Sequence, residues 1–275
     1  MNHLSVVTWN AEGMFVDGTK TKRANPHDAL RVIRELDADI IVIPEFGNLA
    51  GLRDEIRTTI QSLGYQIASS MYHDARVPDL GFVILSRLPI IAEHTHSLAV
   101  TGRTFLELVC KDPQNNHLRI IGVHLDDRGE AIRMKQVGGV VSVINQDNTI
   151  PTLLVGDMNA MHETSQFAAF VRSKLARSIV RRVKHEQIAR VASAVQDMAM
   201  GTTIAYLLKE TTLHDLDTKN RRTISGKQRG LEWIPAVRLA KIDWIFGSKQ
   251  FRTLSYRIMR DVGSDHRPVL AKIQY

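Results

Sequence analysis

Polar and acidic side chains stand at the ends of several apolar runs in this sequence. These residues are Asn10, Glu12, Glu45, His124, Asp157, Asn159, Asp243, Asp265 and His266. In α/β folds, binding and catalytic sites collect at strand ends, because the rigid sheet holds the side chains while the loops admit a ligand. We therefore expect these residues to converge on one site.

The residue types suit one kind of chemistry. Carboxylates without cysteine form the hard oxygen sites that Mg²⁺ prefers, with Mn²⁺ as a substitute. A histidine can donate to a phosphate oxygen or protonate a leaving group. An aspartate beside an asparagine can orient and deprotonate water, and an aspartate paired with a histidine can fix the tautomer of that histidine. The set indicates attack on phosphorus by metal-activated water.

Short apolar runs predict the strands that must hold these side chains. They cover residues 4–10, 39–45, 80–86, 104–110, 118–125, 152–157, 241–248 and 267–275. Several are apolar on both faces, which is typical of strands covered on each side. Helical spacing of apolar residues predicts helices over 26–38 and 128–146. The mixture favours an α/β fold of β-sheets with outer helices.

Two further features refine this organisation. The runs at 80–86, 104–110 and 118–125 have no helix between them, which predicts an antiparallel meander. Residues 166–211 read as long helices. Because the motifs run from residue 8 to residue 268 and build one site, we predict a single domain over 1–275 with a helical insertion at about 166–211.

Composition excludes several classes of protein. Hydrophobic residues make up 44% of the 275-residue chain, which supports a packed core and argues against disorder. The single cysteine, Cys110, excludes an internal disulfide and a cysteine-rich zinc site. Neither a signal peptide nor an apolar run long enough to span a membrane is visible, so we expect a soluble cytoplasmic protein without a membrane partner.

The net charge of +7 favours a polyanionic partner, and nucleic acid, DNA first, is the one we expect. Candidate phosphate contacts are Arg128, Arg177 and Arg181. The last two belong to a basic stretch at 172–190, where spacings of three and four residues can place several cations on one helix face. The ordinary alternative for this stretch is a solvated helix face.

The motifs together resemble the endonuclease/exonuclease/phosphatase superfamily. They are TWNAEG, PEFGN, GFVILSRLPI, GVHLDDR, LLVGDMNA, KIDWIFGS and GSDHRPVLAKI, in this order along nearly the whole chain. The segment HLDDRGEAIRMKQV is similar to the H-L-x-x-R pattern of the tyrosyl-DNA phosphodiesterase branch and its bacterial relatives. The resemblance implies two packed mixed β-sheets flanked by helices in a four-layer, DNase-like α/β sandwich.

The resemblance also implies roles for the strand-end residues. Glu45 matches the main metal-binding glutamate, with Asn10, Glu12 and Asp265 at or near the metal. Asp157 matches the aspartate that activates water. The remaining implied catalytic residues are Asn159, which orients phosphate, Asp243, which pairs with the final histidine, His266 itself, and His124. Pro44 departs from the family, because glutamine commonly precedes the metal glutamate.

We carry forward three functional hypotheses. The first is a magnesium-dependent phosphodiesterase or nuclease. The second is a phosphatase or phospholipase-type hydrolase of a small or lipid phosphate ester. The third is a catalytically inactive binding protein on the same fold, which is disfavoured because suitable residues fill every expected catalytic position.

Overall fold

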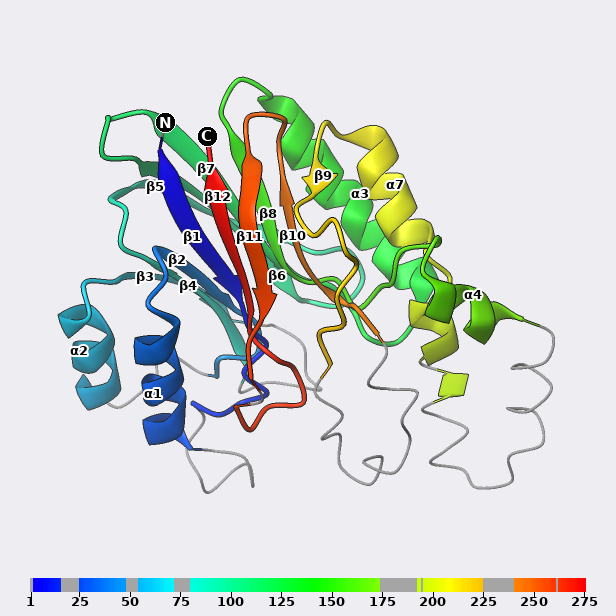
Figure 1. The fold of residues 1–275 in the computed structure, drawn as a ribbon, viewed down its shortest axis with the longest axis horizontal. Helices are drawn as coiled ribbons and strands as arrows, with labels where there is room; N and C mark the ends of the chain where they lie inside the picture. Colours follow the sequence, from blue (N-terminus) through cyan, green and yellow to red (C-terminus); the bar gives the residue numbers. More distant parts are fainter. Residues whose placement is uncertain are drawn as a thin grey trace.

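Two six-stranded β-sheets pack face to face in the computed structural model of this chain (Figure 1). The structure describes residues 2–15, 25–47, 54–71, 80–173, 192–193, 195–224, 240–260 and 262–275. Helices lie on the outer faces of both sheets, as the sequence predicted. Among the described residues, no helix has the length and apolar character needed to cross a bilayer.

The first sheet contains the first and last strands of the chain, side by side. In spatial order its strands are β11 (Arg252–Ile258), β12 (Val269–Gln274), β1 (His3–Thr8), β2 (Ile40–Ile43), β4 (Gly81–Ser86) and β3 (Gln66–Met71). Strands β1 and β2 are parallel, and the other pairs are antiparallel.

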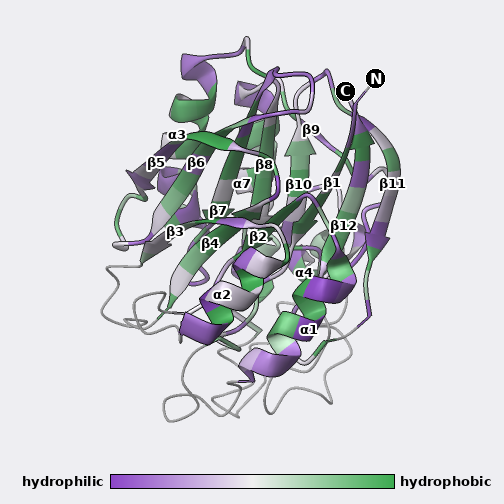
Figure 2. Cartoon of the chain, turned by 90° about the vertical axis from the view of Figure 1, so that its left-hand side faces the viewer, coloured by the Kyte–Doolittle hydropathy of each residue, from purple (hydrophilic) through white to green (hydrophobic). Residues whose placement is uncertain are grey.

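Helices α1 (Pro26–Leu36) and α2 (Asp54–Ser62) cover the outer face of the first sheet. The Asn25 side chain caps α1 by accepting from the Asp28 backbone N–H at 3.2 Å, and Pro26 begins the helix where no backbone donor is needed. Figure 2 shows hydrophilic and hydrophobic residues alternating along both helices. Their apolar residues face the sheet.

The second sheet carries the strands at the centre of the chain. Its order is β5 (Ile90–Ser97), β6 (Thr104–Lys111), β7 (His117–His124), β8 (Thr152–Asp157), β10 (Asp243–Gly247) and β9 (His214–Asp215). Only β7 and β8 are parallel. Helices α3 (Glu130–Gln146) and α7 (Thr202–Glu210) pack on its outer face.

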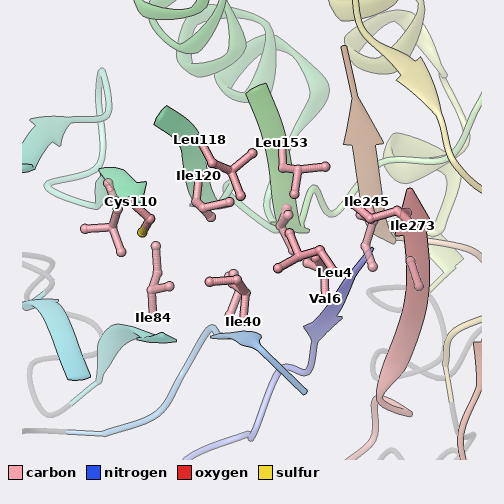
Figure 3. Close-up of a cluster of buried hydrophobic side chains, with 14 of the residues drawn as sticks. Leu4, Val6, Ile40, Ile84, Cys110, Leu118, Ile120, Leu153, Ile245 and Ile273 are labelled. Atoms are coloured by element: carbon pink, nitrogen blue, oxygen red, sulfur yellow. The ribbon is translucent and has the colours of Figure 1, made fainter. Parts of the chain in front are cut away.

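The main core lies between the two sheets. Side chains of both inner faces meet there, among them Val6 and Ile40 from the first sheet and Ile120 and Leu153 from the second (Figure 3). The sheets approach closely at Gly122, where an added Cβ would lie 2.7 Å from the Phe82 ring. A side chain at this position would force the sheets apart.

All eight predicted strands are present, but the predicted meander is wrong in one respect. Strands β6 and β7 form an antiparallel pair, whereas β4 belongs to the other sheet and meets β6 only across the core. Chain continuity without a helix cannot distinguish a hairpin from a crossing between packed sheets. The predicted helical insertion begins with α4 (Gln166–Arg172) and ends with α7; its basic centre, with Arg177 and Arg181, lies outside the described residues.

Candidate active site

Three of the predicted residues form one row across the end of the second sheet. His124 is the register partner of Asp157 in the parallel pair β7–β8, and Asp157 is the partner of Asp243 in the antiparallel pair β8–β10. Directly opposed residues project to the same face of a sheet. All three are almost completely buried.

Three residues near the strand ends adopt left-handed backbone conformations, which turn the chain towards the row of His124, Asp157 and Asp243. Glu12, Glu45 and Asn159 have positive φ angles of 49°, 52° and 47°, in the left-handed region that non-glycine residues seldom adopt. The chain therefore turns sharply just after β1, β2 and β8. Such strained residues collect at functional sites.

Gly156 keeps β7 and β8 close together at the same place. Its φ is 147°, and a Cβ at this position would lie 1.9 Å from the Val123 carbonyl oxygen. No other residue fits against β7 at this point. The glycine of the GDMN motif thus serves the close approach of Asp157 to His124.

Asn10 links the two sheets through one amide group. Its Nδ2 donates to Glu45 Oε1 at 3.2 Å and to Asp157 Oδ2 at 3.1 Å. Its Oδ1 accepts from the Glu12 backbone N–H at 2.9 Å, and its carbonyl accepts from Ser264 Oγ at 2.7 Å. A residue that follows β1 in the first sheet therefore holds an acidic residue of each sheet in place.

His266 contacts two carboxylates of the row. Its Nδ1 lies 2.9 and 3.0 Å from the two Asp243 oxygens, and its Nε2 lies 3.8 Å from Asp157 Oδ2. Burial opposes a charge on this ring, but the surrounding carboxylates, Asp243 first, outweigh it and raise the pKa of His266 well above its usual value. His266 is therefore an imidazolium at neutral pH.

The pKa of Asp157 is raised to about 7. Burial is the main cause and the charge of Asp243 adds to it, while His266 acts in the opposite direction. The Asn159 backbone N–H donates to Asp157 Oδ1 at 2.8 Å, which fixes the orientation of the carboxyl group. Asn159 Nδ2 donates to the Leu125 carbonyl at 3.0 Å and so ties the turns after β7 and β8 together.

His124 has a charged neighbour that the sequence did not reveal. Arg103 Nη1 lies 3.2 Å from His124 Nε2 and donates to the Leu125 carbonyl at 2.7 Å, while Nη2 donates to Asp127 at 2.9 Å. Because arginine has only donors, His124 Nε2 is the acceptor in this pair. Burial and the charge of Arg103 lower the pKa of His124 well below its usual value, so its ring is neutral.

The position of Arg103 explains why sequence reasoning missed it. It precedes β6, whereas most of the predicted site residues follow apolar runs. Since β6 is antiparallel to β7, the start of β6 lies at the same edge of the sheet as the end of β7. The sequence feature that marks Arg103 is a single arginine directly before an apolar strand. Only the strand topology shows that this position lies beside His124.

Glu12 and Asp265 complete the cluster. Glu12 Oε2 accepts from the Asp265 backbone N–H at 3.0 Å, and Asp265 Oδ1 lies 3.8 Å from His266 Nε2. Glu45 Oε1 lies 3.6 Å from His124 Nε2. Contacts of 3.8 Å or less therefore connect all nine predicted strand-end residues, and the structure brings them together in one cluster.

The charge balance of the cluster fits a hard divalent cation. Burial and the charge of Asp265 raise the pKa of Glu45, as burial and Asp243 raise that of Asp157. Ligand atoms of Asp157, Asp243 and His266 also lie within 4.8 Å of one another. The carboxylates are crowded, and the positive charge nearby is too small to balance theirs. Sites of this kind, with mostly oxygen donors, favour Mg²⁺ and Mn²⁺.

Arg128, a predicted phosphate contact, lies beside the buried Asp126. Its guanidinium is 3.4 Å from the Asp126 carboxylate and its side chain is 46% exposed. The backbone N–H of Arg128 also donates to Asp126 Oδ1 at 2.8 Å. The structure thus shows a local ion pair at this position, with the outer part of the side chain open to solvent.

Comparison with known proteins gives a consistent family and fold. The model of the Endonuclease/Exonuclease/phosphatase family matches residues 7–266. No curated protein is significantly similar in sequence. A family protein from Leptotrichia buccalis has a similar structure, with a TM-score of 0.67 and 15% identity over 99% of this chain and all of that one.

Two other similar structures have more specific descriptions. The human Nocturnin catalytic domain, solved with a bound sulfate anion, has a TM-score of 0.64 at 15% identity and covers 99% of this chain and 94% of its own. ANGEL2, described as a 2′,3′-cyclic phosphatase, has a TM-score of 0.64 at 15% identity, with coverage of 98% and 95%. At such identities the likeness establishes a shared fold.

Proposed function

The chain belongs to the endonuclease/exonuclease/phosphatase family, and on that premise we propose that it hydrolyses phosphodiester bonds of DNA or RNA with a hard divalent cation as cofactor. The observation that carries the proposal is the arrangement around Asp157. One carboxyl group with a pKa of about 7 lies within 3.8 Å of a cationic histidine and is held by an asparagine from the opposite sheet. A site that only bound nucleic acid would need none of this.

We assign the cation to Glu45 and Asn10, with Asp265 and Glu12 beside them. The alternative trio of Asp157, Asp243 and His266 is less suitable, because His266 Nδ1 is already hydrogen-bonded to both Asp243 oxygens. Glu45 is the more accessible carboxylate, with a side chain that is 24% exposed. A bound Mg²⁺ would neutralise phosphate charge and make the phosphorus more electrophilic.

Asp157 acts as the general base in this proposal. Its pKa near 7 suits a group that must accept a proton at neutral pH. The attacking water gives its proton to Asp157 while its oxygen bonds to phosphorus. The bond from phosphorus to the leaving oxygen breaks, and that oxygen takes up a proton from solvent. Asn10 and the Asn159 backbone fix the direction from which Asp157 approaches the water.

His266 stabilises the negative charge that develops on the phosphate. Asp243 holds Nδ1 and keeps the imidazolium charged, so Nε2 is left to donate towards substrate oxygens. Preorganised donors of this kind contribute about a hundredfold to a thousandfold in rate. His124, neutral and oriented by Arg103, forms the other wall of the site.

The test is hydrolysis of a panel of substrates by the purified protein with and without Mg²⁺. The panel contains plasmid DNA, single-stranded DNA, RNA, 5′-tyrosyl DNA, a 2′,3′-cyclic nucleotide and simple phosphate monoesters and diesters. We expect cleavage of a polynucleotide, loss of activity in EDTA and recovery with Mg²⁺ or Mn²⁺. Activity on the phosphate monoesters alone would favour the phosphatase alternative, and full turnover in EDTA would refute the metal dependence.

A further inference from the structure

A second surface feature lies next to the active site, on the side of the first sheet. It is a groove of about 950 Å³ between α1, the end of β11, the loop segment 219–222, and the residues Met259, Arg260, Val262, Arg267 and Pro268. None of its described lining residues belongs to the nine residues of the site. We call it the basic groove, after its six cationic residues Lys219, Arg221, Arg222, Arg257, Arg260 and Arg267.

Three of the six cations in the basic groove have no acidic partner among the described residues. Among its described lining residues, Glu35 is the sole acidic one, and it pairs with Arg260 at 2.6 Å. Arg221 pairs with the buried Asp217. Lys219, Arg222 and Arg257 are exposed, and no described carboxylate lies within 4.0 Å of their charged groups.

The floor of the basic groove is apolar. Met259 and Val262 are partly exposed there and pack in the same cluster as the buried Val32 and Leu36 of α1, whereas Ile258 lines the groove but packs towards the core between the sheets. Free inorganic phosphate would use the cations and leave this floor in contact with water. A chain that alternates phosphates with flat, weakly polar rings would use both.

One segment connects the basic groove to the active site. The Thr223 hydroxyl accepts from the backbone N–H groups of Ile242 and Asp243, at 3.2 and 3.3 Å. The Thr223 carbonyl accepts from the Arg267 backbone at 2.8 Å, and Arg267 Nη2 donates to the Arg222 carbonyl at 2.7 Å. The wall that carries the groove cations therefore also positions Asp243, and Arg267 directly follows His266.

We propose that the basic groove binds a single-stranded polynucleotide, as the continuation of the strand whose phosphodiester is cleaved at the active site. The cations contact successive phosphates, and unpaired bases lie on the floor formed by Met259 and Val262. A paired duplex would keep its bases away from this floor. The proposal rests on the proposed function, because it names the substrate class of the same site.

Charge reversal on the groove tests the proposal. Arg222→Glu/Arg257→Glu changes two exposed cations with no described ion pair. Lys249→Glu/Arg252→Glu is the matched control, with the same change of charge at exposed residues near the opposite end of β11, outside the groove lining. Affinity for labelled single-stranded DNA and RNA of 4, 8 and 16 nucleotides is measured in EDTA at several salt concentrations.

We expect the groove variant to bind the 16-mer roughly tenfold more weakly at about 100 mM salt. Its slope of log K against log salt should be shallower by about 1.4, the value for two lost contacts to a single strand. The control should match the wild type, and the duplex of the same sequence should bind more weakly than the single strand. Hydrolysis of bis(p-nitrophenyl) phosphate should be equal in all three proteins.

Several results would overturn the proposal. Equal loss of affinity in both double variants would show that only overall charge matters. Poly-glutamate competing as well as the oligonucleotide would indicate an acidic polypeptide, and a duplex bound as tightly as the single strand would exclude unpaired bases on the floor. If the wild type binds the oligonucleotide through the groove but does not hydrolyse a phosphodiester, the proposed function is refuted and the groove proposal is not. Failure of one proposal is therefore distinguishable from failure of the other.

Discussion

Asp157 and Asp243 lie directly opposite each other at the shared end of β8 and β10. Like charges in this cross-strand position repel, and both side chains are buried. The arrangement is tolerable because His266 lies 2.9 Å from one carboxylate and 3.8 Å from the other. The charge of the histidine and the protonation of Asp157 are therefore coupled, and this coupling determines how the site should respond to mutation and pH.

Replacing His266 should cost more activity than replacing its partner Asp243. His266→Ala removes the donor to the phosphate, so kcat should fall by roughly a hundredfold to a thousandfold. Asp243→Ala leaves Nε2 in place and should cost less, because Asp243 acts through the histidine. Steady-state kinetics with saturating Mg²⁺ measure both, with circular dichroism as the check on folding. A larger loss for Asp243→Ala would contradict the assigned roles.

Asp157→Asn should abolish most turnover while the fold is retained. The amide oxygen can still accept from the Asn159 backbone, but the group can no longer take a proton from water. A loss of about a hundredfold or more in kcat is expected, with little change in KM. The control is the same change at the exposed Asp37, which should leave kcat unchanged. Near-normal rates for Asp157→Asn would place the base elsewhere.

The metal-free protein should lose stability as pH rises from about 6.5 to 8.5, a range above the normal pKa of His124, whose lowered pKa acts in the opposite direction at lower pH. The pKa of Asp157 is raised to about 7, so the folded state binds more protons than the unfolded state between its normal pKa and 7. The raised pKa of His266 acts in the same direction: its stabilising contribution is complete below its normal pKa and is lost as pH rises through the folded pKa. Thermal melts in EDTA should show this decline.

Two comparisons isolate the contribution of the site to this decline. Asp157→Asn should show a shallower fall in Tm with pH, by roughly a few degrees over the range. Addition of Mg²⁺ at pH 8.5 should restore part of the lost Tm in the wild type, because a ligand that binds only the folded state stabilises it. Identical pH dependence of Tm in the wild type and the variant would contradict the assignment.

Arg103 should act as a positioning residue for His124. Arg103→Met removes the donor to His124 Nε2 and one donor to the Leu125 carbonyl, and kcat should fall by about tenfold. Arg103→Lys should recover part of the rate, because it keeps the charge without the planar fork. In a double-mutant cycle with His124→Ala, the two losses should be strongly non-additive. Additive losses would show that Arg103 acts independently of His124.

The sequence predicted the central strands and the strand-end residues for the same reason. A strand such as β8, covered on both faces, is a continuous apolar run, and the polar residue that ends it is easily seen. Asp157, Glu45 and His124 were identified in this way. The family resemblance then supplied two packed sheets, which the structure confirms. The individual roles of the site residues remain predictions.

The strands that sequence reasoning missed are the four edge strands, β3, β5, β9 and β11. An edge strand is partly exposed, so its residues need not be apolar; β5 reads IIAEHTHS and is mostly exposed. The assignment of β4 and β6 to different sheets was also missed. That assignment depends on contacts between strands distant in sequence, which no local pattern contains.

The division of the site between two sheets has a consequence for how activity is lost. Asn10 follows a strand of the first sheet, and its partner Asp157 ends a strand of the second. A relative slip of the sheets by one residue, about 3.3 Å, would separate them while leaving every strand intact. Catalytic activity therefore depends directly on the relative position of the two sheets. A partly unfolded state that keeps its secondary structure but loosens its core would already be inactive.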